Sequence, residues 1–162
     1  MQRIAQFMHV SPERFRADWA DAFPGAEAPE FPALPRRATA GSAGYDFFAP
    51  LAFRLEPGEG IRIPTGVRAR IAEGWVLMLF PRSGLGFKYR LQLNNTVGVV
   101  DADYFGAKNE GHIFCKLHNA GDRPVSVRRG EAFAQGVFLP FGIATDDAAD
   151  GERTGGFGST DE

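Results

Sequence analysis

The sequence predicts an all-β fold, a jelly-roll-like barrel or sandwich, with a short helix near the N-terminus and a flexible C-terminal arm. Three observations favour this class. The 162 residues include 20 glycines and 11 prolines, so turns are frequent. The apolar runs are short, and most are bounded by Gly, Pro, Asn or Asp, which is typical of many short strands. Hydrophobic residues make up 44% of the chain, which is enough for one core and one compact domain.

The first 37 residues are predicted to be an addition to the β core. After a short strand at 3–10, Ser11 suits an N-cap and Pro12 suits the first position of a helix. Aromatic residues then recur at every fourth position, as they do on one face of a helix, until Pro and Gly end the pattern. The proline-rich stretch 26–37 is predicted to be an extended linker.

The β core is predicted to run from residue 38 to residue 144. Its short strands are rich in β-branched and aromatic residues. They are expected at 45–49, 60–64, 67–71, 75–80, 92–100, 112–119, 125–127 and 132–140. The last stretch, 145–162, begins acidic and alanine-rich and ends rich in glycine, which predicts a flexible arm.

Composition narrows the classes of function. The net charge is −2, so no global positive field attracts a nucleic-acid polymer, and an anionic ligand must be met by local cations. One cysteine cannot form an internal disulfide, and no segment has the pattern of a signal peptide or a membrane span. These features favour a soluble cytoplasmic protein. His112, Cys115 and His118 are possible zinc ligands, but on a strand Cys115 would point away from both histidines.

The segment 81–86 follows an apolar strand and favours phosphate binding. Arg82 offers a forked cationic donor, and Ser83 offers a hydroxyl. Gly84 and Gly86 can expose backbone amides in a turn that wraps phosphate oxygens. The alternative is an ordinary exit from a strand into a turn.

The run 95–104 ends in two carboxylates and an aromatic ring. Alternation along an extended chain would place Asp101 and Asp103 on one side and Tyr104 on the other. One carboxylate could then orient a water molecule as a general base, and the tyrosine ring could pack on a sugar. The alternative is a solvated turn after a buried strand.

Two weaker patterns gain meaning only beside these motifs. Asp46 and Gln135 are polar residues in otherwise apolar strands, where structural hydrogen bonding is the usual explanation. The C-terminal tail combines charge, an aromatic ring and hydroxyls among glycines, which suits a segment that wraps a ligand, although flexible filler is the alternative. The tail residues concerned are Arg153, Phe157, Ser159 and Thr160.

In order and spacing, five segments resemble the five motifs of trimeric dUTPases, which hydrolyse dUTP to dUMP and pyrophosphate. The segments are 44–46, 81–86, 98–104, 130–135 and 153–160, so the resemblance covers most of the chain. The chain departs from the usual pattern at Gly86, where alanine is common, and at Ala132 and Phe133, where Arg-Ile is common. The N-terminal helix and the longer stretch 105–112 resemble a longer bacterial and phage subgroup.

The resemblance implies a role for each motif residue. Asp101 would activate the attacking water, and Tyr104 would underlie the deoxyribose and leave no space for a 2′-hydroxyl. Asp46 would act near Mg²⁺ through water or by holding Arg82. The uracil edge would be read by Asn95 with the backbone around Gly98 and Val99, and the phosphates would be met by Arg82, Ser83, Gly84 and Gln135. The closing arm would contribute Arg153, Phe157, Gly158, Ser159 and Thr160.

The resemblance also implies Mg²⁺ as cofactor and a homotrimer in which the arm of one chain closes a pocket shared by two others. A dCTP deaminase, or a bifunctional deaminase and pyrophosphatase, shares this fold and is the alternative enzyme. Those enzymes more often have Arg-Ser-Ser in the second motif, whereas Gly84 follows Ser83 here. A non-catalytic nucleotide-binding regulator is a third alternative, and the joint presence of Asp101, Arg82 and Arg153 argues against it.

Overall fold

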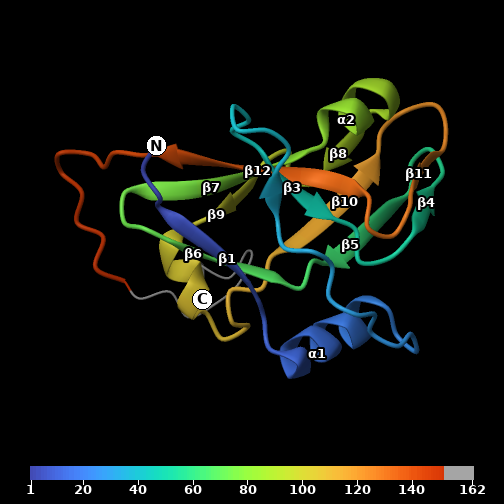
Figure 1. Cartoon of the computed structure of the whole chain (residues 1–162), viewed down its shortest axis with the longest axis horizontal. Helices are drawn as coiled ribbons and strands as arrows, with labels where there is room; N and C mark the ends of the chain where they lie inside the picture. Colours follow the sequence, from blue (N-terminus) through green and yellow to red (C-terminus); the bar gives the residue numbers. More distant parts are fainter. Residues whose placement is uncertain (152–162) are drawn as a thin grey trace.

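The computed structural model describes residues 1–151, which form a β-sandwich with a helix packed at one side (Figure 1). The described strands make hydrogen-bonded sheets of five, three, two and two strands. These ladders do not close into a barrel, so the sandwich form of the predicted all-β class is the one observed. No helix in this part of the chain is both long and apolar enough to cross a membrane.

The largest sheet contains or borders most of the predicted site residues of the core. Its strand order is β2-β3-β12-β7-β9, and every neighbouring pair is antiparallel. The strands are β2 (Arg36–Arg37), β3 (Tyr45–Phe48), β12 (Ala132–Pro140), β7 (Trp75–Pro81) and β9 (Gly98–Val100).

Three smaller sheets complete the sandwich. The three-stranded sheet consists of β5 (Gly60–Pro64), β10 (Phe114–Asn119) and β8 (Leu91–Leu93). The two-stranded sheets pair β11 (Val125–Val127) with β4 (Phe53–Leu55), and β1 (Ala5–His9) with β6 (Val67–Ile71).

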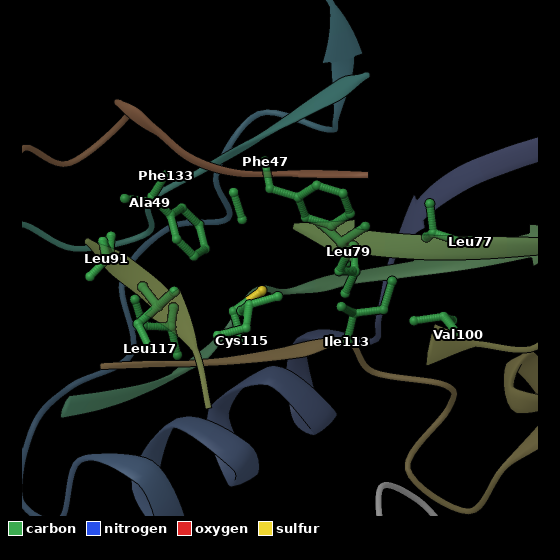
Figure 2. Close-up of a cluster of buried hydrophobic side chains, with 14 of the residues drawn as sticks. Phe47, Ala49, Leu77, Leu79, Leu91, Val100, Ile113, Cys115, Leu117 and Phe133 are labelled. Atoms are coloured by element: carbon green, nitrogen blue, oxygen red, sulfur yellow. The ribbon is translucent and has the colours of Figure 1, made fainter. Parts of the chain in front are cut away.

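The main apolar core lies between the sheets (Figure 2). Alternate side chains of each strand point inward, so Leu77 and Leu79 of β7 face Phe47 of β3 within one buried cluster. A bulge in β12 between Ala132 and Ala134 accompanies the complete burial of Phe133. Each such side chain stabilises the fold by about 2 kcal/mol relative to its exposure to water.

The predicted single strand at 92–100 is wrong, because the chain turns at 94–97. Thr96 has a left-handed φ of 66°, and its N–H donates to the Leu93 carbonyl at 2.9 Å. As a result β8 and β9 belong to different sheets. The two asparagines before Thr96 are strong turn formers, and here they outweigh the β propensity of the surrounding residues.

Two short helices replace the loops expected at the second and third motifs. α2 (Ser83–Tyr89) stands where a glycine-lined turn was predicted, because its glycines lower helix propensity without preventing a helix. η1 (Ala102–Gly106) is a 3₁₀ helix that begins directly after Asp101. The extended alternation predicted for Asp101, Asp103 and Tyr104 is therefore wrong. The short strands β2 and β4 were not predicted.

The N-terminal helix α1 (Pro12–Ala22) is confirmed. The Ser11 side chain accepts the Arg14 N–H at 3.1 Å, as expected of an N-cap. Phe15 and Trp19 pack with Val10 in a small second core beneath the helix. At the other end of the chain, residues 141–151 extend from β12 without helix or strand (Figure 1).

Stability should depend on pH through His112, whose buried imidazole connects α1 to the core. Burial lowers the pKa of His112 below its ordinary value of 6.5, so the folded chain keeps the ring neutral while the unfolded chain takes up a proton. The contribution of His112 to the free energy of unfolding is therefore fully present above about pH 6.5. It falls as the pH drops toward the lowered pKa, by up to about 1.4 kcal/mol per pH unit.

Thermal melting of His112→Gln between about pH 8 and pH 5 checks this expectation. We expect the variant to melt lower at neutral pH and to lose part of the acid-side slope. His118→Gln, on a partly exposed histidine of β10, is the control and should keep the slope. An unchanged slope in His112→Gln would contradict the assignment.

Candidate active site

Three strands bring Asp46, Arg82 and Gln135 together at one end of the largest sheet. β12 lies between β3 and β7, and its register places Gln135 opposite Asp46 on one side and opposite Phe80 on the other. Arg82 directly follows β7, and its backbone N–H donates to the Phe133 carbonyl at 3.2 Å. A carboxylate, a guanidinium and a carboxamide thus lie side by side.

Asp46 holds the guanidinium of Arg82 through an ion pair between Oδ1 and Nη1. The Asp46 side chain is 14% exposed, whereas that of Arg82 is 39% exposed. A guanidinium has five N–H donors, so a bond through one terminal nitrogen does not saturate it. The pair therefore orients a cation that stays accessible to an anionic ligand.

Gln135 is packed against the backbone of the first and second motifs. Its Nε2 donates to the Pro81 carbonyl at 3.3 Å. A Cβ at Gly44 would lie 2.8 Å from its Oε1, so glycine leaves room for the carboxamide in this position. Ser83 and Gly84 begin α2 and are exposed, and the first N–H groups of a helix have no partner within the helix.

The residues predicted to bind the nucleoside form a second group around β9. Asn95 is exposed in the 94–97 turn, and Val99 is exposed on β9. A Cβ at Gly98 would lie 3.0 Å from the Leu79 Cβ, so glycine permits the close approach of β9 to β7. The predicted catalytic residue Asp101 is half-buried at the N-cap position of η1, and Tyr104 follows within that helix.

A cavity of about 490 Å³ opens beside Asn95. This volume is within the range of small-molecule sites, about 300–1,000 Å³. Its lining combines cations, amides, a carboxylate and a ring: Asp18, Arg62, Asn94, Asn95, Asn109, Phe114 and Lys116. A larger hollow of about 680 Å³ lies along the N-terminal strand and contains none of the predicted site residues. The smaller cavity is the candidate nucleoside site, because its lining includes the predicted site residue Asn95.

Within one chain, the two groups are far apart. Val100 lies opposite Leu77 on β7, so Asp101 lies beyond Leu77 toward the start of that strand. Arg82 lies at the other end, five residues past Leu77, which corresponds to about 17 Å of strand. In Figure 1, α2 and the yellow turn after β9 lie on different sides of the sandwich. A water held by Asp101 and a phosphate held by Arg82 of the same chain would not meet.

Comparison with known proteins decides the family. The dUTPase family model matches residues 32–160. The chain belongs to the dUTPase family. The deoxyuridine 5'-triphosphate nucleotidohydrolase of Lactococcus lactis is 45% identical over 130 residues, which cover 78% of this chain and 87% of the relative. That of Desulfitobacterium hafniense is 42% identical over 137 residues, covering 80% and 87%.

Solved structures agree with the family assignment. The dUTPase from Streptococcus mutans has a TM-score of 0.63 and 36% identity to this chain, and the match covers 85% of this chain and 97% of that one. The dUTPase from phage phi11 of S. aureus is 21% identical with a TM-score of 0.65, a likeness that shows the shared fold.

The remaining predicted residues are those of the fifth dUTPase motif and the possible zinc ligands. Those of the fifth motif, Arg153, Phe157, Gly158, Ser159 and Thr160, lie outside the described residues. Two of the three possible zinc ligands, Cys115 and His112, are accounted for by their surroundings. Cys115 is buried in the core, where burial raises its pKa to about 12, and both ring nitrogens of His112 are hydrogen-bonded within the protein.

Sequence reasoning missed two residues that border the site of this dUTPase-family chain. Asn109 donates from Nδ2 to the Tyr104 hydroxyl at 2.7 Å. Asp18 binds His112, which is 94 positions away in the sequence. Local spacing holds no signal for a contact at that separation.

Proposed function

We propose that the chain hydrolyses dUTP to dUMP and pyrophosphate, which limits uracil in DNA and supplies dUMP for dTMP synthesis. The observation that supports it most is the ordered set of dUTPase motifs in a chain of that family. Two observations on the described residues support it as well. The partly exposed Arg82 is oriented by Asp46, and Asp101 follows β9, the strand that begins where the 94–97 turn ends.

The reaction is a displacement at the α-phosphorus. Asp101 accepts a proton from water as that water attacks in line, and pyrophosphate leaves on the opposite side. Arg82, Ser83, Gly84 and Gln135 meet the phosphates. Preorganised donors of this kind stabilise the developing charge by about 3 kcal/mol each, because their orientation is fixed before the reaction.

The nucleoside is selected by the second group. Asn95, with the backbone of Gly98 and Val99, reads the edge of uracil through hydrogen bonds. Tyr104 underlies the deoxyribose and excludes a 2′-hydroxyl. A site that hydrogen-bonds one base edge rejects another base, because the mismatched polar groups are left unpaired.

Mg²⁺ would be held mainly by the phosphates of the substrate, and Asp46 would act near it through water. Among residues 1–151, no three carboxylate, imidazole or thiol groups cluster so as to hold a metal ion. Asp46 alone, as one carboxylate near the phosphates, fits a Mg²⁺ ion that takes most of its ligands from the nucleotide and from water, as Mg²⁺ usually does. When bound, the ion neutralises phosphate charge.

The active enzyme is a homotrimer with three shared sites, and the arm of one copy closes over the pocket of two others. Two observations support this assembly. The separation of Asp101 from Arg82 along β7 favours an arrangement in which different copies supply the two side chains to one substrate. Beyond β12, the apolar side chains of Phe141 and Ile143 are 53% and 74% exposed, as expected of a segment that another copy covers.

Light scattering and steady-state kinetics on the full chain and on a chain lacking 151–162 test the assembly. We expect both proteins to be trimers. The truncated protein should lose turnover by about 100-fold or more, since it lacks the cation and the hydroxyls that close on the phosphates. A fully active monomer, or normal turnover without the arm, would contradict the proposal.

The reaction itself is tested by pyrophosphate release from dUTP, UTP, dCTP and dTTP, with Mg²⁺ and with a chelator. We expect rapid release from dUTP with Mg²⁺, and a kcat/KM at least about 100-fold lower for each of the others. Ammonia release from dCTP would instead reveal a deaminase. Tight nucleotide binding without turnover would indicate a regulator.

A further inference from the structure

The hydroxyl of Tyr104 is held by the stretch that follows it. It donates to the His112 carbonyl at 2.7 Å and accepts from Asn109 Nδ2 at 2.7 Å. Asn109 Oδ1 accepts the Gly111 N–H at 3.2 Å, which turns the amide nitrogen toward the phenol. Tyr104 is only 3% exposed, and the tip of its ring is therefore placed by residues 109 and 112 as well as by η1.

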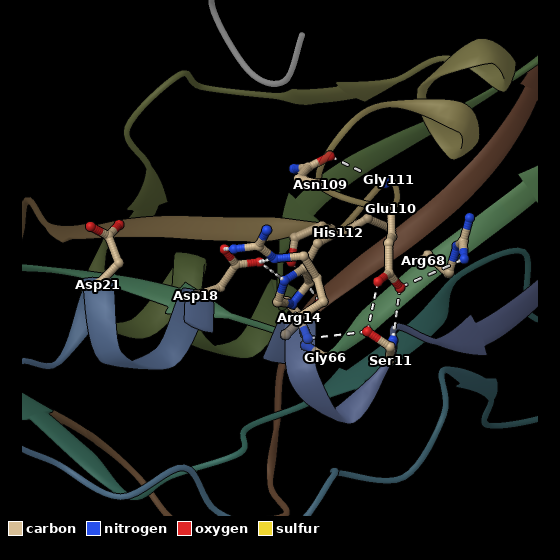
Figure 3. A network of polar contacts seen from close by, with 12 residues as sticks. Ser11, Arg14, Asp18, Asp21, Gly66, Arg68, Asn109, Glu110, Gly111 and His112 are labelled. Carbon is tan, nitrogen blue, oxygen red and sulfur yellow. Dashed lines mark hydrogen bonds and ion pairs between the residues drawn. The ribbon is translucent and has the colours of Figure 1, made fainter. Parts of the chain in front are cut away.

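His112 is fixed in turn by helix α1 (Figure 3). Its Nε2 accepts the backbone N–H of Gly66 at 2.8 Å. Because an amide N–H can only donate, Nε2 has no proton, and Nδ1 must be the protonated nitrogen. Nδ1 then donates to Asp18 Oδ2. The neutral ring is the form that burial favours.

Asp18 is rigid on its helix. Arg14, one turn earlier, donates from Nε to Oδ2 at 3.0 Å and from Nη2 to Oδ1. A bidentate pair of this kind fixes the plane of the carboxylate as well as its position. Arg14, Asp18 and His112 thus form a continuous series of contacts. Through it, the position of α1 determines the position of His112, whose carbonyl accepts the Tyr104 hydroxyl.

A second attachment holds the same stretch to the start of α1. The Glu110 carboxylate accepts the Ser11 N–H at 2.8 Å and the Ser11 hydroxyl at 2.6 Å. These hydrogen bonds hold the pKa of Glu110 below its usual value, so the carboxylate is charged. Glu110 has a left-handed φ of 61°, a conformation that costs about 1 kcal/mol or more and needs outside support.

The network also borders the cavity beside the 94–97 turn. Asp18 and Asn109 line this cavity together with Asn95, the residue predicted to read uracil. The chain elements that hold the phenol are therefore the same ones that shape the wall next to the base-reading turn.

We propose that Asp18 and Asn109 are positioning residues that hold Tyr104 against the sugar and so set the discrimination between deoxyribose and ribose nucleotides. The inference rests on the proposed function, in which Tyr104 underlies the deoxyribose. Loss of either contact lets the ring move away from the sugar. A 2′-hydroxyl is then tolerated, and the dUTP complex loses part of its contact with the ring.

Asp18→Ala, compared with Glu13→Ala on the same helix, tests this role. Glu13 forms an exposed ion pair with Arg16 at 2.9 Å, and neither residue lines the cavity beside Asn95, so its loss is a matched change outside the network. The readout is the ratio of kcat/KM for dUTP to kcat/KM for UTP. We expect Asp18→Ala to lower this ratio about tenfold, mainly by raising KM for dUTP. Glu13→Ala should keep it within about twofold.

A purely structural role gives a different result, because a smaller folded fraction lowers both values of kcat/KM equally and leaves their ratio unchanged. Asn109→Ala is the second variant, since it removes the donor to the phenol without touching α1. It is expected to lower the ratio as Asp18→Ala does. An unchanged ratio in a folded variant, measured beside a wild type that hydrolyses dUTP, would overturn the inference. A wild type without dUTP hydrolysis would overturn the proposed function, and this inference with it.

Discussion

Asp101→Asn is expected to lower kcat for dUTP by about 1,000-fold, which is within the range for loss of a general base. A carboxamide cannot take the proton of the attacking water, although it keeps the shape of the carboxylate. The fold should tolerate the change, because Asp101 has an ordinary extended backbone before η1 (φ −78°, ψ 160°), which Asn adopts as well, and its side chain makes no cap hydrogen bond to that helix. Binding of a non-hydrolysable dUTP analogue, measured by calorimetry, should change little.

Asp103→Asn is the matched control, because it removes the same charge two residues away on an exposed side chain. We expect its kcat to stay within about threefold of the wild type. If Asp101→Asn kept near-normal turnover, the assignment of the base would be wrong. An equal loss in both variants would show that the negative charge of the segment matters rather than the position of one carboxylate.

Local signals explain which parts of the fold were predictable. Helix α1 was predicted because Ser11 and Pro12 favour a helix start and because the aromatic spacing is helical. The break at 94–97 was missed because it depends on the left-handed φ of Thr96, a residue whose β-branched side chain favours strands. α2 was missed because glycines at 84 and 86 indicate a turn more strongly than they indicate a helix.

Residue type and order mark the candidate site residues, whereas tertiary contacts leave no such signal. The motif pattern marked Asp46 and Arg82 as candidates although they are 36 positions apart, and the structure shows the contact between them that the resemblance offered as one of two roles for Asp46. The contacts of α1 with residues 109–112 bridge more than 90 positions and involve common residue types, so no sequence pattern marks them. Their place beside Tyr104 follows only from the packing of α1 on β5 and from the left-handed turn at Glu110.

Arg82→Ala is expected to lower kcat for dUTP by about 100-fold to 1,000-fold, the usual effect of losing one preorganised donor to a developing charge. The free energy of unfolding should change far less, by about 1 kcal/mol, because the ion pair with Asp46 is partly exposed to water. Arg82→Lys keeps the charge but loses the forked geometry, so its turnover should fall between the two. Kinetics and urea unfolding of the same preparations measure both quantities.

Arg54→Ala separates this effect from a general loss of positive charge. Arg54 is the exposed residue of β4, between the buried Phe53 and Leu55, and it pairs with Glu56 at 2.8 Å, so its removal should leave turnover within about twofold. Asp46→Asn gives a second comparison, because it leaves the guanidinium in place but removes the carboxylate that orients it. A kcat between those of wild type and Arg82→Ala would show that orientation contributes beyond charge. If turnover in Arg82→Ala fell only in proportion to the folded fraction, Arg82 would have a structural role and the phosphates would have to be met by other donors.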